Sequence, residues 1–221
     1  MLTAILPSAV VVAETRADLP DAVLFADEAA AIAAAVPKRR QEFARGRACA
    51  HRALQGLGRV PVGIPPGPRG EPRWPPGVVG SITHCAGYCA AAVAEAHAIT
   101  TLGIDAEPHE ALPVGVLGTI ARVEEQRMLQ QLQRDASAIR WDRLLFSAKE
   151  SVYKAWFPIA RRWLGFEQAT LAIDPSAGTF TARLLVPGPP LGETTLQALS
   201  GRWRVADGLV ITAVALRAPA G

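Results

Sequence analysis

The sequence is short of long apolar runs, of cysteine and of net charge, and each shortage narrows what the protein can be. No run of about 18 apolar residues occurs, so neither a membrane-spanning helix nor a membrane partner is expected. Three cysteines among 221 residues are too few for a disulfide framework and indicate a reducing, cytoplasmic setting. A net charge of +3 is too small to predict nucleic-acid binding, but it suits a protein that binds anionic small molecules or acidic partners.

Lysine is the scarcest charged residue. Lys38, Lys149 and Lys154 are the only lysines among 23 basic residues, so arginine carries most of the positive charge. Two of the three lie within six residues of each other, which directs attention to that segment. Half of the residues are hydrophobic, which is enough for a buried core and argues against a disordered chain.

Hydrophobic periodicity and turn residues predict an α+β chain. The order of elements indicates two α+β halves that meet near residues 108–118, although no strict sequence repeat marks them. Asp207-Gly208 predicts a hairpin turn, and Pro158 is expected to stop or kink a long helix. The expected elements are a strand over 1–12, helices over 38–57, 119–134 and 137–157, and strands over 89–98, 101–107, 166–173, 179–186, 203–206 and 209–216.

Residues 61–80 contain seven prolines and five glycines, a density that excludes a helix or a central strand. One interpretation is a disordered linker. Trp74 and the apolar pair Val78-Val79 favour an ordered loop that leads into a strand, and such loops often carry binding groups.

Two acidic side chains end a predicted strand. Asp105 and Glu107 are two residues apart, so they project from the same face, and no basic residue lies beside them in sequence. Paired carboxylate oxygens suit Mg²⁺, which takes one or two protein carboxylates and fills its shell with water and phosphate. The alternative is a solvated strand end followed by a turn.

Glu150 and Lys154 lie four residues apart on a predicted helix, close enough to act at one site. They are either an ordinary surface ion pair or a carboxylate and a cation that serve a phosphate. The rarity of lysine in this chain and the flanking Phe146, Tyr153 and Trp156 favour the second interpretation.

His84 follows the proline-rich loop and is either a structural histidine or a donor to a phosphate. Cys85 and Cys89 lie nearby, but they do not complete the closed tetrahedral set of a structural zinc site. Arg39 and Arg47 are eight residues apart on one side of a predicted helix, which is either an exposed basic face or a phosphate site. Together these groups fit phosphoryl-type transfer, in which cations hold a diphosphate and a carboxylate takes the nucleophile's proton.

The same residues carry a resemblance to a known family over about residues 38–158. In order and spacing they resemble the motifs of the Sfp-type 4′-phosphopantetheinyl transferases, and most closely the enterobactin-synthase component D-like branch. The matching segments are Gly46-Arg47 with its helix, Gly70-Glu71-Pro72-Arg73-Trp74-Pro75, Gly80-Ser81-Ile82-Thr83-His84, Gly103-Ile104-Asp105-Ala106-Glu107 and Phe146-Ser147-Ala148-Lys149-Glu150-Ser151-Val152-Tyr153-Lys154.

This resemblance implies an α+β pseudo-dimer of two similar lobes, residues 1–110 and 111–221, with the active site in the cleft between them. It implies Mg²⁺-dependent transfer of 4′-phosphopantetheine from coenzyme A to a serine of an acyl or peptidyl carrier protein, with release of 3′,5′-ADP. Such carriers serve fatty-acid, polyketide and nonribosomal-peptide biosynthesis. The protein is expected to be a monomer, because a pseudo-dimer already contains its own cleft.

The resemblance also implies individual roles. Asp105, Glu107 and Glu150 would bind Mg²⁺, with Glu150 alternatively the base for the carrier serine, and Lys154 would offset charge on the phosphate and the leaving group. The coenzyme would be bound by Arg39, Arg47, Arg69, Thr83, His84 and Lys154.

The sequence departs from the family pattern at two places. Arg69 is the only basic residue available where the loop before the Gly-Glu-Pro segment commonly has a lysine. A third acidic metal position would be Glu124 or a water molecule. An acidic carrier helix suits this arginine-rich chain and would dock near residues 109–135.

Three rival interpretations remain. One is another Mg²⁺-dependent nucleotide or phosphate transferase that uses the same groups. A second is an inactive carrier-binding module, which the intact Asp105, Glu107, Glu150 and Lys154 argue against. A third is a zinc-stabilised nucleic-acid adaptor, for which the chain lacks ligands.

Overall fold

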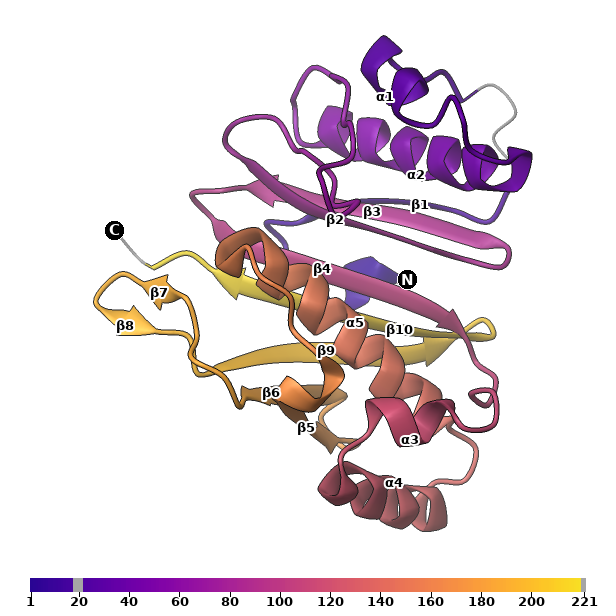
Figure 1. Cartoon of the computed structure of the whole chain (residues 1–221), viewed down its shortest axis with the longest axis vertical. Coiled ribbons are helices and arrows are strands. Elements are labelled where there is room, and N and C mark those ends of the chain that lie inside the picture. The colour runs from indigo at the N-terminus through magenta and orange to yellow at the C-terminus, as the bar shows by residue number, and fades with distance from the viewer. Residues whose placement is uncertain (18–21, 220–221) are drawn as a thin grey trace.

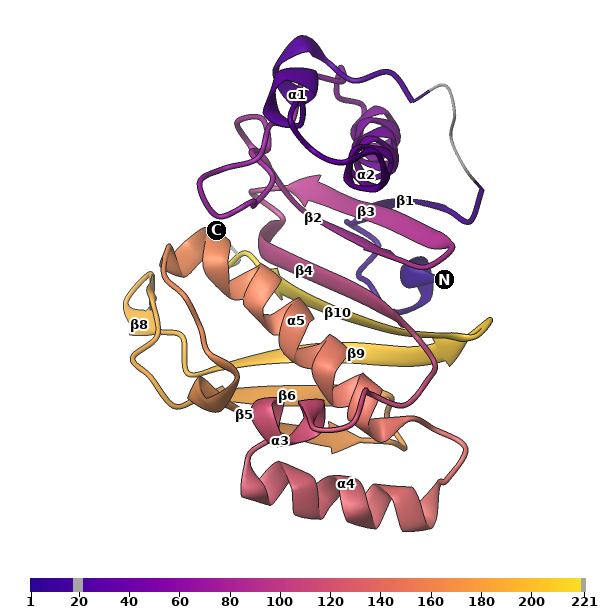
Figure 2. The same cartoon turned by 45° about the vertical axis from the view of Figure 1, so that its right-hand side comes forward.

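The computed structural model describes residues 1–17 and 22–219 and stacks them in four layers (Figures 1 and 2). A long helix covers one sheet, that sheet packs face to face on a second sheet, and another long helix crosses the far side. The helices are α1 (Ala26–Ala31), α2 (Pro37–Gly56), α3 (Val116–Ile120), α4 (Val123–Asp135) and α5 (Trp141–Ala160), with 3₁₀ turns η1 (Leu2–Ala4) and η2 (Phe166–Gln168). The strands are β1 (Val11–Thr15), β2 (Val78–Cys85), β3 (Tyr88–Glu95), β4 (Ile99–Pro108), β5 (Ala169–Asp174), β6 (Thr179–Leu184), β7 (Pro190–Leu191), β8 (Thr194–Thr195), β9 (Ala198–Ala206) and β10 (Leu209–Arg217).

The N-terminal sheet is antiparallel with strand order β1-β3-β2, and α2 covers one face of it. Pro37 occupies the first turn of α2, where its missing N–H costs nothing. The helix buries Cys49, Ala50 and Ala53 against small residues of β3, which lets the helix lie close to the sheet. The predicted helix over 38–57 is thereby confirmed as Pro37–Gly56.

The C-terminal sheet is antiparallel with strand order β4-β10-β9-β6-β5, and α5 runs diagonally across it (Figure 2). Trp141, Leu144 and Trp156 of α5 are fully buried in the core between helix and sheet. The predicted β9–β10 hairpin is confirmed: Asp207 and Gly208 both have positive φ angles, 50° and 74°, as the turns that match strand twist require.

Strand β4 joins the two halves of the molecule. Its backbone pairs with β10, while Leu102, Ile104 and Ala106 pack against Ala90 and other small residues of β3. Strands β3 and β4 are consecutive, as predicted, but they belong to different sheets. The predicted lobe boundary at residues 110 and 111 stays a prediction, and β4, which precedes it, is hydrogen bonded to a strand that follows it.

Four expectations about elements are wrong. Residues 1–12 are not one strand, because Leu2–Ala4 is a 3₁₀ turn and the strand begins at Val11. The helix expected over 119–134 is split at Ala121, whose backbone is extended. The strand expected over 166–173 begins only at Ala169, because Phe166–Gln168 is a 3₁₀ turn. Pro158 does not stop α5, which continues to Ala160 and is followed by Arg161 in a left-handed conformation. The α+β class is confirmed, and no helix in residues 1–17 or 22–219 is long and apolar enough to span a membrane.

Candidate active site

A close contact between α5 and β4 positions the first site residues. A Cβ on Gly103 of β4 would lie 2.0 Å from the Ser151 carbonyl oxygen and 2.7 Å from the Ala155 nitrogen, so the helix lies directly on the strand backbone. One strand pleat further, Asp105 faces α5, and Lys154 Nζ donates to Asp105 Oδ1 at 2.7 Å and to the Ile104 carbonyl at 3.1 Å. Glycine at position 103 is therefore what lets the lysine reach the aspartate.

Asp105 is almost fully buried, with 4% of its surface exposed. Thr83 of β2 donates its hydroxyl to Asp105 Oδ1 at 3.3 Å, and it accepts the Ala106 amide. The second oxygen, Oδ2, is buried and has no hydrogen-bond partner among the described residues. An unpartnered buried carboxylate oxygen is costly unless a cation or water meets it.

Ser81 and Thr83 hold the free edge of β4. Ser81 Oγ accepts the amide of Ile104 at 3.1 Å, and Thr83 does the same for Ala106. Thr83 is therefore placed between the strands, 2% exposed, and does not line the large pocket described below, contrary to the expectation that it faces a ligand. Ser81 was missed, although a hydroxyl at every second strand position is a signal for such edge capping.

Glu107 lies on the same face as Asp105, as the strand spacing predicts. Its Oε2 accepts a hydrogen bond from Arg143 Nη1 of α5 at 2.9 Å. Burial, and then the charge of Asp105, raise the pKa of Glu107, while Arg143 opposes the shift. Asp105 and Glu107 thus each have a basic partner, Lys154 and Arg143, that is distant in the sequence.

Glu150 projects from α5 one turn before Lys154 and is half-buried. Burial raises the pKa of Glu150, with a further contribution from the negative charge of Asp105 and an opposing one from Lys154. A carboxyl with a raised pKa binds a proton more readily than an ordinary glutamate does, which suits a group that must accept one.

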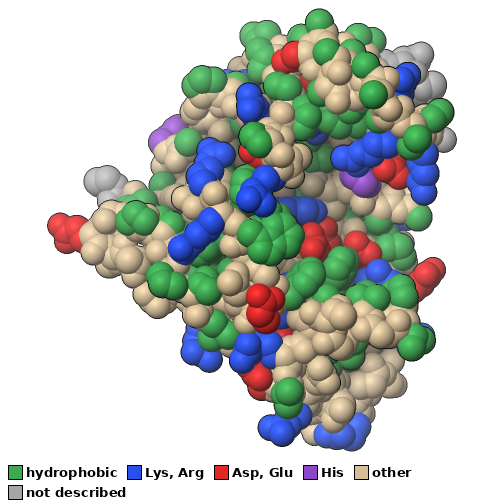
Figure 3. All heavy atoms as spheres, viewed as in Figure 1, with side chains coloured by type: hydrophobic (Ala, Val, Ile, Leu, Met, Phe, Trp, Pro, Cys, Tyr) green, Lys and Arg blue, Asp and Glu red, His purple; other side chains and the backbone are tan. Residues whose placement is uncertain are grey.

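A pocket of about 1140 Å³ lies between α2, the loop over 66–74, β2 and the C-terminal half of α5. Glu150 and Lys154 line it, whereas Asp105 and Glu107 do not. Figure 3 shows acidic and basic side chains gathered around this hollow in the middle of the face. Glu42, Glu71 and Glu150 are its acids. Its basic lining comprises Arg39, Arg47, Arg69, Arg73, His84, Lys154 and Arg161.

The structure brings most of the predicted binding residues to this pocket. Arg39 Nη1 donates to His84 Nε2 at 3.3 Å, which requires a neutral imidazole at that nitrogen. Burial, together with the charges of Arg39 and Lys154, lowers the pKa of His84 and supports that neutral form, while Glu42 and Asp105 oppose the shift. Arg73 and Arg161 were missed; Arg73 stands within the loop motif and could have been found there.

Comparison with known proteins decides the family. Residues 27–94 match the 4′-phosphopantetheinyl transferase N-terminal domain, and residues 101–213 match the 4′-phosphopantetheinyl transferase superfamily. This chain belongs to the 4′-phosphopantetheinyl transferases. The two matched segments divide the transferase between β3 and β4 and support two domains.

Two curated relatives are similar along almost their whole length. The transferase is 53% identical to 4′-phosphopantetheinyl transferase Svp of Streptomyces mobaraensis, over 100% of this chain and 91% of that protein. It is 47% identical to 4′-phosphopantetheinyl transferase Npt of Nocardia iowensis, over 97% and 99%. The predicted function, a 4′-phosphopantetheinyl transferase that activates carrier proteins, is confirmed.

The finer assignment to the enterobactin-synthase component D-like branch needs correction. Enterobactin synthase component D of Salmonella typhi is 36% identical over only 54% of the transferase and 49% of its own length. Because Svp and Npt are more similar and match nearly throughout, the transferase is described by the Sfp-type family and not by that branch.

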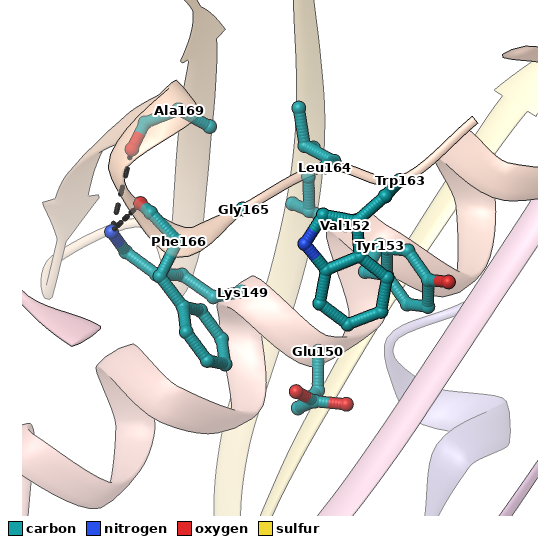
Figure 4. Close-up of a pocket in the computed structure, with 9 residues that line it drawn as sticks. All are labelled: Lys149, Glu150, Val152, Tyr153, Trp163, Leu164, Gly165, Phe166 and Ala169. Carbon is teal, nitrogen blue, oxygen red and sulfur yellow. Dashed lines mark hydrogen bonds between the residues drawn. The ribbon is translucent and has the colours of Figure 1, made fainter. Parts of the chain in front are cut away.

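A second, smaller cavity of about 70 Å³ lies on the other side of Glu150 in the transferase (Figure 4). Tyr153 and Trp163 pack beside it with ring centroids 4.7 Å apart and planes tilted by 55°, and Leu164 and Phe166 also line it. The cavity is largely apolar, so it offers space next to Glu150 from which water is easily displaced.

Lys149 does not face the large pocket, although it shares a motif with Lys154. Its Nζ donates to Glu125 Oε2 at 2.8 Å and to the carbonyls of Phe166 and Ala169, the last two shown in Figure 4. Glu124, the suggested third metal position, is exposed and paired with Arg122 at 2.6 Å. The structure therefore gives Lys149 a structural role and Glu124 an ion pair at the surface.

In the described part of the chain, no three Asp, Glu, His or Cys side chains are already arranged as a complete metal site. The residues nevertheless fit a hard cation, because Asp105 has an unpartnered oxygen and its charge raises the pKa of both Glu107 and Glu150. Carboxylates that repel one another in this way are stabilised when a divalent cation joins them.

Proposed function

We propose that the large pocket binds coenzyme A and that phosphopantetheine transfer takes place beside Glu150. The observation that carries this proposal is the lining itself: five arginines, one lysine and one histidine surround a pocket that also contains Glu150. Coenzyme A carries a diphosphate and a 3′-phosphate, and a ligand of that charge needs several cations in a concave site.

The cations divide by their position. Lys154, held against Asp105, is nearest to the acidic groups and would neutralise the diphosphate and the leaving 3′,5′-ADP. His84 and Arg39, which contact each other, would bind a phosphate together. Arg47 and Arg69 would bind the nucleotide end, and Thr83 would act indirectly by holding Asp105.

The transfer needs one proton acceptor. The serine oxygen of the carrier would form a bond to the phosphorus that bears pantetheine, the bond from that phosphorus to the oxygen of 3′,5′-ADP would break, and Glu150 would take the serine proton. The raised pKa of Glu150 and its place between the two cavities support this role.

Asp105, Glu107 and Glu150 would hold Mg²⁺, the cation that members of this family use in general together with coenzyme A. When bound, the ion would supply positive charge for the diphosphate oxygens. If Glu150 is mainly a base, Glu150→Gln should leave the Mg²⁺ concentration for half-maximal Mg²⁺ binding, measured by calorimetry in the presence of coenzyme A, nearly unchanged. A large rise in that concentration would instead make Glu150 a metal ligand.

The small cavity would take the pantetheine arm. It adjoins Glu150, and the rings of Tyr153, Trp163 and Phe166 that line it would contact the methylene groups of that arm. The carrier would then dock along residues 109–135, where Val114 and Val123 are exposed large hydrophobics. Arginines near this surface would meet an acidic carrier helix.

The two halves of the chain would form a pseudo-dimer with this site in the cleft between them. A repeated arrangement supports the proposal. In each half the third residue of a short helix is a buried glutamate, Glu28 or Glu125, that bonds a basic residue of a 20-residue helix and a backbone amide further along the chain. A monomer would then contain one complete site.

One experiment tests the function and the site. The protein is incubated with coenzyme A, Mg²⁺ and several apo carrier proteins, and the carriers are weighed by mass spectrometry. We expect each competent carrier to gain one phosphopantetheine, Asp105→Ala and Glu150→Ala to abolish the gain, and EDTA to stop it. Full activity in both variants would overturn the site, and no gain with any carrier would overturn the function.

Glu95→Gln serves as the matched control, because it removes an acidic group that pairs with Arg59 on the exposed surface of the N-terminal sheet. This variant should transfer at the wild-type rate. The control separates loss of a site carboxylate from a general effect of removing negative charge.

A further inference from the structure

A buried glutamate outside the pocket controls part of its wall. Glu28 of α1 is fully buried. Its Oε2 accepts the amide of Phe25, and its Oε1 accepts both His51 Nε2 at 2.9 Å and the amide of Ile64 at 2.8 Å. A carboxylate held by three donors inside the protein is well stabilised, so its position is fixed.

Both backbone groups of Ile64, its N–H and its carbonyl, are hydrogen bonded to buried side chains, an arrangement that we call the clamp. Glu28 accepts its N–H, while Arg47 donates from Nε to its carbonyl at 2.6 Å. The Arg47 guanidinium also lies 4.0 Å above the ring of Phe43 and 4.0 Å from Glu28 Oε1. Arg47 lines the large pocket, so the clamp fixes a pocket cation and a loop residue at once.

The chain after Ile64 forms a closed arch that lines the pocket. Arg73 donates its amide to the Pro65 carbonyl at 3.0 Å, and Gly67 donates to Glu71 at 2.7 Å, so the arch is hydrogen bonded across its base. Arg69 lies at its tip, and its amide donates to the Glu71 carboxylate. The clamp at Ile64 therefore fixes the point at which this arch begins, and with it the position of Arg69.

We propose that Glu28 is a positioning residue for the nucleotide half of coenzyme A. It orients Arg47 directly and the Arg69 arch through Ile64, without itself reaching the ligand. This inference rests on the proposed binding of coenzyme A in the large pocket. A carboxylate is required, because only an acceptor with no N–H of its own can take hydrogen bonds from Phe25, His51 and Ile64 together.

The test measures the affinity for 3′,5′-ADP, the nucleotide half of coenzyme A, by isothermal titration calorimetry. In Glu28→Gln we expect the Kd for 3′,5′-ADP to rise about tenfold, the loss that one charge-assisted hydrogen bond accounts for. In steady-state assays the KM for coenzyme A should rise by a similar factor, while kcat and the KM for the carrier change little.

Glu125→Gln is the matched control. It removes the charge of an equally buried glutamate at the same helix position, but in the C-terminal half. This variant should bind 3′,5′-ADP like the wild type even where its melting temperature falls as far as that of Glu28→Gln. The comparison separates positioning of the arch from a general loss of stability.

Two outcomes decide against the inference or against its basis. If Arg69→Ala binds 3′,5′-ADP as tightly as the wild type does, the proposed coenzyme site is wrong. If Arg69→Ala weakens binding and Glu28→Gln does not, only the positioning role is wrong. Should Glu28→Gln fail to fold, His51→Phe carries the test, since it removes one donor to Glu28; a wild-type Kd in this variant overturns the inference.

Discussion

The two buried glutamates repeat one arrangement with different partners. Glu28 bonds His51, whose side chain is 12% exposed, and lies 4.0 Å from an arginine that lines the pocket. Glu125 bonds Lys149, which is 3% exposed and surrounded by two carbonyls of the segment that leads into β5. The N-terminal pair thus lies next to an arginine of the large pocket, whereas the C-terminal pair lies next to the small cavity, which Lys149 lines.

Because of this difference, we expect Glu28 to affect the cations of the large pocket and Glu125 to affect the position of α5. The N-terminal pair lies beside Arg47 of the proposed coenzyme A pocket, so its effects should be seen in ligand affinity. The C-terminal pair fixes the part of α5 that carries Glu150, so its effects should be seen in folding stability and turnover.

The largest effect is expected at Lys149. Lys149→Met leaves the Glu125 carboxylate buried without its cation and should reduce the free energy of unfolding by about 3–5 kcal/mol. Urea denaturation measures the change. His51→Phe should cost less, because Arg47 still lies 4.0 Å from Glu28 Oε1 in that variant.

A double variant sharpens this result. Lys149→Met combined with Glu125→Leu removes both charges and should recover much of the stability lost in the single variant. If the double variant is as unstable as the sum of the two single changes, the buried pair does not act as a unit.

The next effect concerns how closely each long helix lies on its sheet. Gly103→Ala places a methyl group within 2.0 Å of the α5 backbone and should cost about 1–3 kcal/mol and lower kcat at least about tenfold. Gly46→Ala of α2 meets only the Ile82 side chain, at 3.2 Å, and gains helix propensity, so its stability should change little. Equal losses in both would show that the two helices pack alike.

The pH dependence of transfer should report Glu150. The raised pKa of Glu150 means that kcat/KM falls as the pH drops through a value above the usual 4.5 of a glutamate, because the protonated group cannot accept the serine proton. A profile of kcat/KM against pH measures this. An acidic limb that stays at or below pH 4.5 would remove Glu150 as the base.

The smallest effect is a gain in stability. Because burial raises the pKa of Glu150, folding disfavours its charged form, and this cost is present at neutral pH and disappears as the pH falls through the folded pKa. Glu150→Gln should therefore raise the melting temperature at pH 7 by about 1–3 °C while it abolishes transfer. A lower melting temperature would mean that the carboxylate is stabilised by its neighbours.

The sequence was informative wherever spacing alone brings residues together. Asp105 and Glu107 share a strand face and Glu150 and Lys154 share a helix face, as their separations of two and four residues require. The hairpin at Asp207 was equally local. Such features depend on the backbone period and need no knowledge of the fold.

Contacts between distant segments could not be predicted in this way. Arg143 pairs with Glu107 across 36 residues, and Ser81 caps a strand 23 residues away. Lys149 looked like a site residue because lysine is rare. Its side chain instead leaves a different side of α5 from Lys154 and donates to Glu125 of α4. Which face of α5 meets which neighbour is decided by packing, and periodicity leaves that choice open.

The contact at Gly103 also constrains how the site can move. With the α5 backbone resting directly on β4, neither element can slide or tilt without a clash, so cation binding must be accommodated by rotation of side chains. The free oxygen of Asp105 can receive a cation while the other oxygen keeps Lys154. The contact between α5 and β4 thus behaves as a rigid platform, and adaptation to different carriers is left to the surface segments.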